Sequence, residues 1–210
     1  MVVIRPFAPD DLADLYAISL ATGHEGGDAT HLHEDPRMIG HIYSAPYGLL
    51  DPGIVLVAED DQGVAGYMAG VADTVIWDKT LETDWWPRLR AEYADPLNVP
   101  RELRNADQKR AHIIHHPRHT PAALTDGWPA HIHLNLLPRL QRRGVGSRLL
   151  GAWIDLALAA GARAAHVGVN PANVGGLAFW AAQGFAPLRL EGLEAGPTVW
   201  MGRTLVVCSS

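Results

Sequence analysis

Cysteine is nearly absent from this chain. Its 210 residues include one cysteine, Cys208, which lies in a polar segment late in the sequence. A single cysteine excludes an intramolecular disulfide and a zinc site built from several cysteines. The polar surroundings argue against Cys208 as a nucleophile. We therefore expect a reducing compartment, and the cytoplasm is the expected location.

Long apolar runs are absent as well. No run approaches the ~20 residues of a membrane-spanning helix. The first residues, MVVIRPFAPDD, lack the apolar core and cleavage site of a signal peptide. Hydrophobic residues make up 48% of the chain and charged residues 19%, which is typical of a folded domain. We expect a single domain over residues 1–210, with no membrane partner.

Positive charge is scarce overall but concentrated locally. The chain has 17 lysines and arginines against 23 acidic residues, for a net charge of −6. Nonspecific nucleic-acid binding needs a broad basic surface, so no nucleic-acid partner is expected. The stretch LNLLPRLQRRGVGSRLL, residues 134–150, nevertheless holds four arginines and no acid. The sequence therefore predicts a local anion site on an acidic protein.

Hydrophobic periodicity and turn signals predict the order of the elements. In chain order we expect a strand at 2–6, a helix at 10–23 capped by Asp10 or Asp11, a loop at 23–36, a short helix at 36–46, a hairpin within 53–73 turning at 60–63, a strand at 130–138, a helix at 146–162, a strand at 163–170, a helix at 171–185 and two final strands within 187–207. Residues 76–128 contain two helical stretches, which we interpret as an insertion into the same domain. This order predicts an α/β fold with a mixed central sheet flanked by helices.

Two of these elements have clear faces. The strand at 130–138 alternates, with one face formed by His131, His133 and Asn135 and the other by Ile132, Leu134 and Leu136. In the helix that follows, Leu149, Trp153 and Leu156 are expected on one buried side, and Gly161 is expected just past its end.

Glycine marks the start of that helix. Gly144 and Gly146 follow an apolar strand and precede an apolar helix. Free backbone N–H groups and the helix dipole favour an anion at such a helix start, and glycine allows close approach. The spacing is not that of a P-loop, which needs Lys-Ser/Thr after the second glycine, nor of a dinucleotide fingerprint, which needs a third glycine. A turn with solvated arginines is the plain alternative.

The same stretch resembles the acyl-CoA-binding signature of the GNAT superfamily of N-acetyltransferases, with Gln141, Gly144 and Gly146 at its fixed positions. The segment VNPANVGGLAFWAAQGF resembles the family's later Asn, aromatic and Gly-Phe helix. Nearly the whole chain follows the family's order of elements. More closely, YMAGVADT, WWPRLRAEYADP and HIHLNLLP are similar to the acetyltransferase-like C-terminal domain of O-GlcNAcase and its free-standing bacterial relatives.

The resemblance implies a GNAT fold, with a helical insertion at about 76–128 before the cofactor-binding strand, and acetyl-CoA as the acyl donor. It places the pantetheine arm beside residues 132–137, the pyrophosphate on the amides of 141–147, and Arg139 or a nearby arginine on the phosphates. Asn173 is expected to bind the pantetheine or simply to cap its helix. The implied acetyl-CoA-binding residues are Leu134, Leu136, Leu137, Gln141, Arg142, Arg143, Gly144, Val145, Gly146, Ser147, Arg148, Asn173, Phe179 and Trp180.

Acetyl transfer to an amine also needs a base, because a free alkylamine has a pKa near ~10.4. Imidazole titrates near neutral pH, so His133 is the first candidate and His131 the second. Asn135 replaces an acidic residue of the resembled domain; it can orient a substrate but cannot accept a proton. Hydrogen-bonded histidines on a half-exposed sheet face are the alternative.

A proton for the departing thiolate is harder to assign. The family commonly uses a tyrosine where this chain has Trp180, and indole cannot act as that acid. Tyr43, Tyr67 or water is expected to replace it, unless the thiolate leaves without help. Trp180 is expected to line the acetyl-CoA channel.

A metal site is not expected. His112, His115 and His116 have helical spacing, but Pro117 interrupts the helix and no flanking Cys or Glu completes a ligand set. We expect these histidines and the loop at 24–35 to line the acceptor pocket instead. The aromatic pair in DWWP is expected in the core.

The sequence thus predicts an acetyl-CoA-dependent N-acetyltransferase that transfers the acetyl group directly within a ternary complex. A non-catalytic acyl-CoA-binding module is the main alternative, and transfer of a longer acyl chain or to an oxygen acceptor is another. The amine acceptor is not identified by the sequence, and both a monomer and a homodimer are compatible with it.

Overall fold

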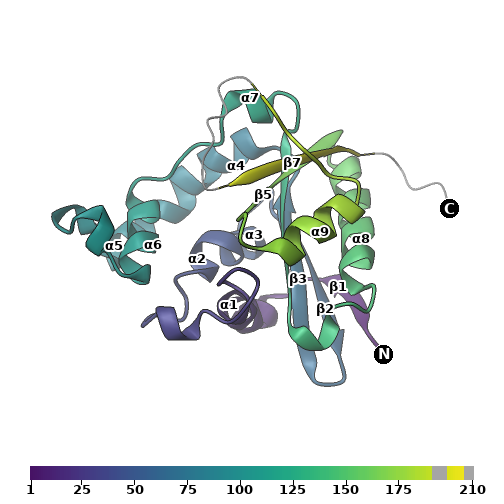
Figure 1. Ribbon diagram of the computed structural model, residues 1–210, viewed down its shortest axis with the longest axis horizontal. Coiled ribbons are helices and arrows are strands. Elements are labelled where there is room, and N and C mark those ends of the chain that lie inside the picture. The colour runs from purple at the N-terminus through teal and green to yellow at the C-terminus, as the bar shows by residue number, and fades with distance from the viewer. Residues whose placement is uncertain (191–197, 206–210) are drawn as a thin grey trace.

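Strands from both halves of the chain form one mixed sheet (Figure 1). The computed structural model describes residues 1–190 and 198–205, so Cys208 lies outside the described residues. The strand order is β1-β2-β3-β4-β5-β7-β6, and β4 with β5 is the parallel pair. The strands are β1 (Val3–Pro6), β2 (Ile54–Asp60), β3 (Gly63–Val71), β4 (Ala130–Leu136), β5 (Ala164–Val169), β6 (Ala186–Pro187) and β7 (Val199–Thr204). The predicted mixed α/β sheet is confirmed.

Helices flank this sheet, and α5 and α6 project to the side of the molecule away from α8 (Figure 1). The α-helices are α1 (Leu12–Ala21), α2 (Gly40–Tyr43), α3 (Ala45–Leu49), α4 (Thr74–Thr80), α5 (Trp86–Glu92), α6 (Ala106–His115), α7 (Ala122–Thr125), α8 (Val145–Ala159) and α9 (Val174–Ala182). A π-helical turn, η3 (Leu81–Trp85), joins α4 to α5. The short 3-10 segments are η1 (Pro9–Asp11), η2 (Thr30–Leu32), η4 (Pro96–Asn98), η5 (Arg101–Leu103) and η6 (Pro138–Leu140). Of the helices described here, none is both long and apolar enough to cross a bilayer.

The start of α1 differs from the expected cap. Asp11 occupies the N-cap position, but its carboxylate accepts no hydrogen bond from the first turn of α1. It accepts instead from the Ala8 amide at 2.8 Å and from the Arg5 guanidinium at 2.7 and 2.8 Å. The 3-10 turn η1 precedes α1, so the carboxylate closes that turn rather than the helix. The Arg5 guanidinium lowers the pKa of Asp11.

Two apolar clusters cover the sheet. One joins the sheet to α8 and α9 through residues that include Leu149, Trp153 and Trp180. The other joins the sheet to α1 and to the helices of the insertion. Leu156 is 44% exposed, contrary to expectation, whereas Ala157 is fully buried. The buried stripe of α8 follows steps of four residues from Val145 to Ala157, which leaves Leu156 at its edge.

Candidate active site

The parallel strands β4 and β5 separate along their length. They pair at Ala130 with Ala165 and at His131 with His166. Beyond His131, β4 continues against β3 as far as Leu136, while β5 continues against β7. Among the described residues, no strand pairs with the β5 side of β4 from Ile132 onward. Backbone groups on that edge are therefore open to a ligand that hydrogen-bonds like a strand.

The N-terminus of α8 lies beside this opening. Gly144 is the N-cap residue and has a φ of 73°, in the left-handed region that favours glycine. The Arg148 amide donates to the Gly144 carbonyl at 3.1 Å. The amides before it, at 145–147, belong to the helix's first turn, where N–H groups have no intrahelical acceptor. The helix start therefore offers donors and a positive dipole end to an anion.

Gly146 lies where β4, α8 and α9 meet. A Cβ at this position would lie 3.0 Å from Cε2 of Phe179 and 3.4 Å from Cδ2 of Leu134. Gly146 is itself buried. The close approach of these elements leaves little room for a side chain, which favours glycine as the second glycine of the motif.

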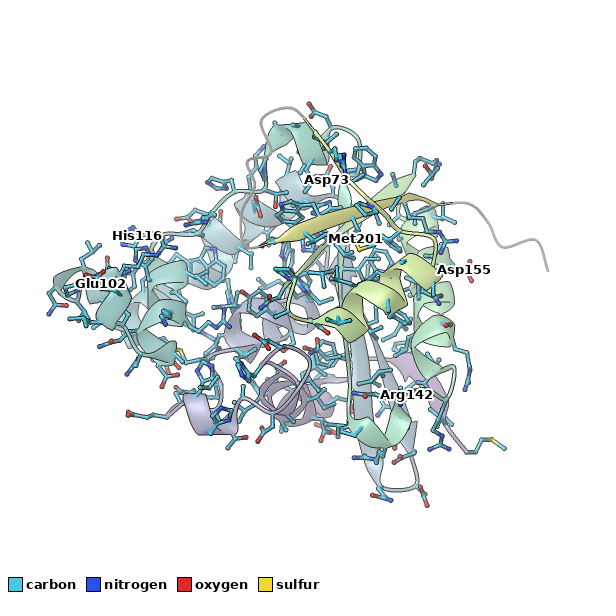
Figure 2. All side chains as sticks on the ribbon, viewed as in Figure 1. Asp73, Glu102, His116, Arg142, Asp155 and Met201 are labelled. Carbon is cyan, nitrogen blue, oxygen red and sulfur yellow. The ribbon has the colours of Figure 1, made fainter. Side chains whose placement is uncertain are left out.

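Three exposed arginines surround this helix start, namely Arg142, Arg143 and Arg148. Figure 2 shows Arg142 on the turn that precedes α8. Within residues 1–190 and 198–205, none of the three has a carboxylate within salt-bridge distance; Arg143 donates to the Arg139 carbonyl at 3.0 Å and Arg148 to the Val2 carbonyl at 3.2 Å. Their charges are therefore available to a bound anion.

Arg139 and Gln141 have structural partners. The Arg139 guanidinium donates to the Asp60 carboxylate at 2.9 Å and lowers the pKa of Asp60. It thereby attaches the turn before α8 to the β2–β3 hairpin, and its charge is already paired with a carboxylate. The Gln141 side chain donates to the Leu136 carbonyl at 2.9 Å.

At α9, the side-chain oxygen of Asn173 accepts from the Gly176 amide at 2.8 Å, so it caps the helix. Trp180 is only 7% exposed and packs edge-to-face with Phe179 at 5.1 Å and with Phe185 at 4.9 Å between ring centroids. It belongs to the apolar core. Phe179, which is only partly buried, is the aromatic side chain nearest Gly146.

On the opposite face of β4, a chain of hydrogen bonds links two histidines. The Thr74 hydroxyl donates to the Pro129 carbonyl at 2.6 Å, and Thr74 Oγ1 lies 2.8 Å from His131 Nδ1. Tyr47 Oη lies 2.7 Å from His131 Nε2 and 3.1 Å from His133 Nε2. The β3–β4 register runs without a bulge from Gly66 to Val71, which keeps both histidines on one face, as predicted.

The chain of donors fixes the tautomers. The Thr74 hydrogen goes to a carbonyl, so Thr74 Oγ1 must accept from His131 Nδ1–H. His131 Nε2 then accepts the Tyr47 hydroxyl, and Tyr47 Oη in turn accepts from His133 Nε2–H. This leaves His133 Nδ1 with a free lone pair, since no hydrogen-bond partner for it occurs among the described residues.

Burial keeps these imidazoles neutral. It lowers the pKa of His133 to about 4 and the pKa of His131 well below its ordinary value, and the proximity of His133 lowers the latter further. Burial also lowers the pKa of His166 to about 4, although its Nδ1 donates to the Trp128 carbonyl at 2.6 Å. The pKa of Tyr47 is raised by its own burial, so Tyr47 stays protonated. At neutral pH, His133 is therefore a base with its lone pair available.

His133 lines a cavity of about 370 Å³, which we call the aromatic cavity. It lies between the separating strands, the π-turn η3 and the segment after α6. Two carboxylates, Asp78 and Glu82, also line it. Glu82 lies 2.6 Å from the Arg90 guanidinium, which is its cationic partner. Asp78 lies 3.5 Å from His119, and burial raises the pKa of the Asp78 carboxyl. Its aromatic lining residues are Tyr43, Tyr47, Trp77, Trp86 and Trp200, and its histidines are His119, His131, His133 and His166.

Of the other candidates for proton transfer, Tyr43 lines the aromatic cavity, whereas Asn135 and Tyr67 do not. The Asn135 amide donates to Thr22 at 2.6 Å, which fixes the end of α1 to β4, and Asn135 does not line the aromatic cavity. Tyr67 is fully buried against Ser19 at 2.9 Å. Tyr43 does line the cavity, with its ring centroid 5.6 Å from that of His133. Its hydroxyl accepts from Arg110 at 3.1 Å, so the phenolic hydrogen remains free to donate.

Comparison with known proteins shows similarity along most of the chain. The model of the family described as Acetyltransferase (GNAT) family matches residues 24–185. Protein O-GlcNAcase of Rattus norvegicus is 24% identical over 203 residues, which cover 96% of this chain, and the mouse protein gives the same figures. The match covers 22% of these proteins, so the chain spans about a fifth of their length.

Solved structures show the same fold. The crystal structure of SsHAT is 29% identical and superposes with a TM-score of 0.87, with 98% of each chain covered. The yncA protein of Salmonella typhimurium, solved with acetyl-CoA, is 19% identical with a TM-score of 0.53, over 100% of this chain and 96% of its own.

Proposed function

Because the chain belongs to the GNAT family of acetyltransferases, we propose that it transfers an acetyl group from acetyl-CoA directly to an amine held in the aromatic cavity. The observation that carries this proposal is His133, a neutral, half-buried base that lines a cavity at the point where β4 and β5 separate. The GNAT fold, with its mixed sheet and separating parallel strands, supports it.

Acetyl-CoA is the acyl donor in this family and supplies an activated thioester. The residues around α8 suit its charge: the amides of 145–147 for the pyrophosphate, and Arg142, Arg143 and Arg148 for the remaining phosphate charge. The open edge of β4 suits the amide-containing pantetheine arm, and an amide of that edge can polarise the thioester carbonyl. The Leu137 amide is excluded from that role because it donates to the Ala65 carbonyl at 2.8 Å.

His133 is the proposed base. Its free Nδ1 accepts a proton from the attacking amine, and the positive charge that develops on the ring is shared through Tyr47 with His131. The same burial that lowers the imidazole pKa lowers the pKa of an amine in the aromatic cavity, since both are charged when protonated. An amine therefore needs less help to lose its proton there than in water.

Tyr43 is the proposed acid for the departing thiolate. It lines the cavity beside His133, and Arg110 holds its hydroxyl oxygen while leaving the hydrogen free. Asn135 is a positioning residue in this mechanism, because its amide fixes α1 against β4 rather than facing the cavity.

The cavity favours an amine on an apolar or aromatic body. Five tyrosines and tryptophans line it, Glu82 is paired with Arg90, and burial raises the pKa of Asp78, which disfavours its charged form. A polyamine would therefore meet little available negative charge in the cavity, whereas an arylalkylamine would stack on the tryptophans. We therefore expect arylalkylamines to be better acceptors than polyamines.

Replacing Gly146 with valine is expected to raise the Kd for acetyl-CoA by about 5–150-fold, because the branched side chain would displace Phe179 towards the channel at a cost of about 1–3 kcal/mol. Calorimetric titration measures this change. Gly151→Ala is the matched control, since a Cβ at Gly151 of the same helix meets nothing within 4 Å. It should leave the Kd unchanged and stabilise α8 by about 0.5–1 kcal/mol. Equal affinity of the Gly146→Val variant would contradict the assigned channel.

Titration with acetyl-CoA and with its 3′-dephospho analogue tests the donor site. The proposal requires saturable 1:1 binding of acetyl-CoA, with weaker binding of the analogue. Substitution of the arginine that holds the 3′-phosphate should make the two ligands bind alike. Absence of acetyl-CoA binding would overturn the proposal. Binding without any amine turnover would instead favour a non-catalytic acyl-CoA-binding module.

A further inference from the structure

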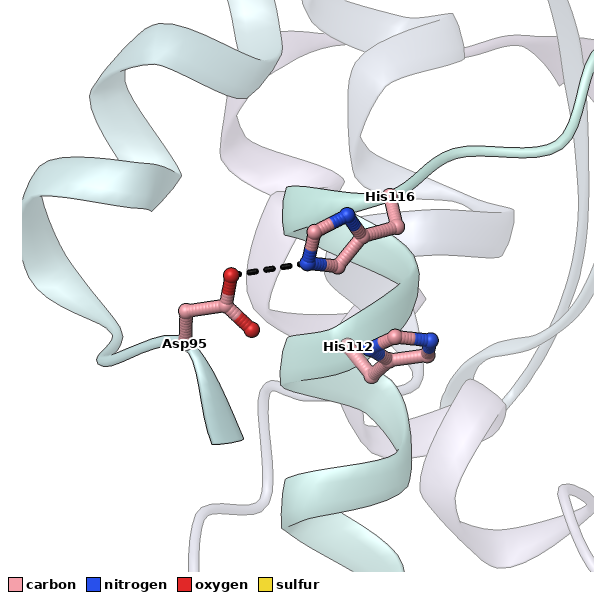
Figure 3. Close-up of side chains that lie close together, drawn as sticks. All are labelled: Asp95, His112 and His116. Carbon is pink, nitrogen blue, oxygen red and sulfur yellow. Dashed lines mark hydrogen bonds and ion pairs between the residues drawn. The ribbon is translucent and has the colours of Figure 1, made fainter. Parts of the chain in front are cut away.

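A second group of chemically active side chains lies on the insertion, remote from α8. Asp95, His112 and His116 each offer one ligand atom, and these atoms all lie within 4.8 Å of one another. Figure 3 shows both imidazoles on the same helix, with the Asp95 carboxylate facing them from a neighbouring segment. Figure 2 shows His116 on the opposite side of the molecule from Arg142.

Local structure brings the three together. Asn105 and Gln108 form a capping box that begins α6. His112 lies in the last turn of α6, and His116, four residues later, is the residue that caps its C-terminus. Asp95 immediately precedes η4. His116 Nε2 lies 2.7 Å from Asp95 Oδ2, and the two imidazole centroids lie 4.6 Å apart.

His115, the other member of the sequence cluster, donates from its Nε2 to the Tyr93 carbonyl at 2.7 Å, and its Nδ1 lies 3.9 Å from Asp95 Oδ2. The group whose ligand atoms gather most closely is His112 of α6, His116 just after that helix, and Asp95 from a segment that precedes it. The sequence pattern did not reveal Asp95 as the third ligand, because η4, η5 and most of α6 separate it from the histidines along the chain.

Two atoms of the group have no hydrogen-bond partner. His112 Nδ1 and Asp95 Oδ1 are buried, and within the described residues neither has a donor or acceptor in range. An unpartnered buried polar atom costs about 1–3 kcal/mol, so an unpaired lone pair beside an unpaired carboxylate oxygen requires an explanation.

We propose that Asp95, His112 and His116 bind a Zn²⁺ ion. Two imidazoles and one carboxylate form a known type of zinc ligand set, with water as the fourth ligand. Zinc bonds of ~2.1 Å place tetrahedral donors ~3.4 Å apart. The ligand atoms now lie within 4.8 Å of one another, so the widest pair must close by up to about 1.4 Å, while His116 Nε2 and Asp95 Oδ2, at 2.7 Å, must move apart. The His116 side chain is 42% exposed, so it is free to make this adjustment. The ion would give the unpaired His112 Nδ1 and the unpaired Oδ1 of Asp95 a partner.

The ion would stabilise one wall of the aromatic cavity. It would tie the end of α6 to the segment before η4, and His116 is followed directly by residues 117–120, which line the cavity. Its role is therefore structural, and it does not depend on the proposed acetyl transfer. Binding and stability report on it without any activity assay.

Titration of the full chain with Co²⁺, followed by displacement with Zn²⁺, tests the site. We expect one equivalent of Co²⁺ to produce the visible bands of a low-coordinate ion and Zn²⁺ to remove them. His112→Ala and His116→Ala should each raise the Co²⁺ Kd more than about tenfold, because the loss of even an outer partner weakens metal sites by about 10–100-fold. Asp95→Asn, which keeps the shape, should do the same.

His119→Ala is the matched control, since His119 lies three residues from His116, is exposed, and pairs with Asp78 instead. Its Co²⁺ affinity should equal that of the unsubstituted chain. Zn²⁺ at 100 times its Kd should also raise Tm by about 5–10 °C, and His112→Ala should abolish that shift. Absence of 1:1 binding, or equal binding by the His112→Ala, His116→Ala and His119→Ala variants, would overturn the proposal.

Discussion

Replacing His133 with glutamine is expected to lower kcat for acetyl transfer by about 10²–10⁴-fold, the usual contribution of a positioned base. The Kd for acetyl-CoA should not change, because the residues proposed to bind its phosphates lie around the start of α8, away from His133. Glutamine retains an N–H that can donate to Tyr47, so the hydrogen-bond chain to His131 has a substitute donor. It has no basic nitrogen. The comparison therefore separates proton transfer from packing.

The pH profile gives a second test of the same residue. With a pKa of about 4, His133 carries a free lone pair throughout pH 5–9. The rate should therefore rise with pH through the amine's own titration, with no inflection near 6.5. Full kcat in the His133→Gln variant, or an inflection near 6.5 that this variant removes, would contradict the proposed base.

Acid is expected to destabilise the fold well before the carboxylates titrate. His133 and His166 have folded-state pKa values of about 4, against about 6.5 in the unfolded chain. Between those values the unfolded state binds one more proton for each histidine, so stability rises with pH and is complete above about pH 7.5. Each imidazole thus removes on the order of 3 kcal/mol of stability as the pH falls from 7.5 to 4.

Urea denaturation at a series of pH values measures this loss. His166→Asn is the informative variant, because its amide can still donate to the Trp128 carbonyl but does not titrate. Between pH 7.5 and 4, the free energy of unfolding of this variant should fall by on the order of 3 kcal/mol less than that of the unsubstituted protein. Identical pH dependence in the two proteins would mean that folding does not change the pKa of His166.

Strand β4, the start of α8 and the β2–β3 hairpin could be predicted from the sequence, because each depends on a pattern of neighbouring residues. Strict alternation in β4 fixed which side chains share a face, and an uninterrupted β3–β4 register preserved it. Gly144 and Gly146 predicted the helix start. The positive φ at Gly144 favours glycine, and the close approach of neighbouring side chains at Gly146 leaves little room for another residue. The hairpin of β2 and β3 followed from its turn residues.

Long-range partners were not predictable. Tyr47 and Thr74 set the tautomers of both histidines, yet they lie 84 and 57 residues from His131 along the chain. Arg139 has no acidic residue near it in the sequence, but in the structure its guanidinium donates to the Asp60 carboxylate. Asp95 joins His112 and His116 only after η4 and η5 have turned the chain back. A single sequence carries no periodic signal for contacts of this kind.

The most direct measurement of the central claim is the release of CoA thiol from saturating acetyl-CoA in the presence of arylalkylamines and polyamines, with His133→Gln in parallel. The account predicts amine-dependent thiol release and formation of the N-acetylated amine, with arylalkylamines preferred and with the rate reduced about 10²–10⁴-fold in the variant. Binding of acetyl-CoA with no amine-dependent release, or release that is equal in the two proteins, would contradict it.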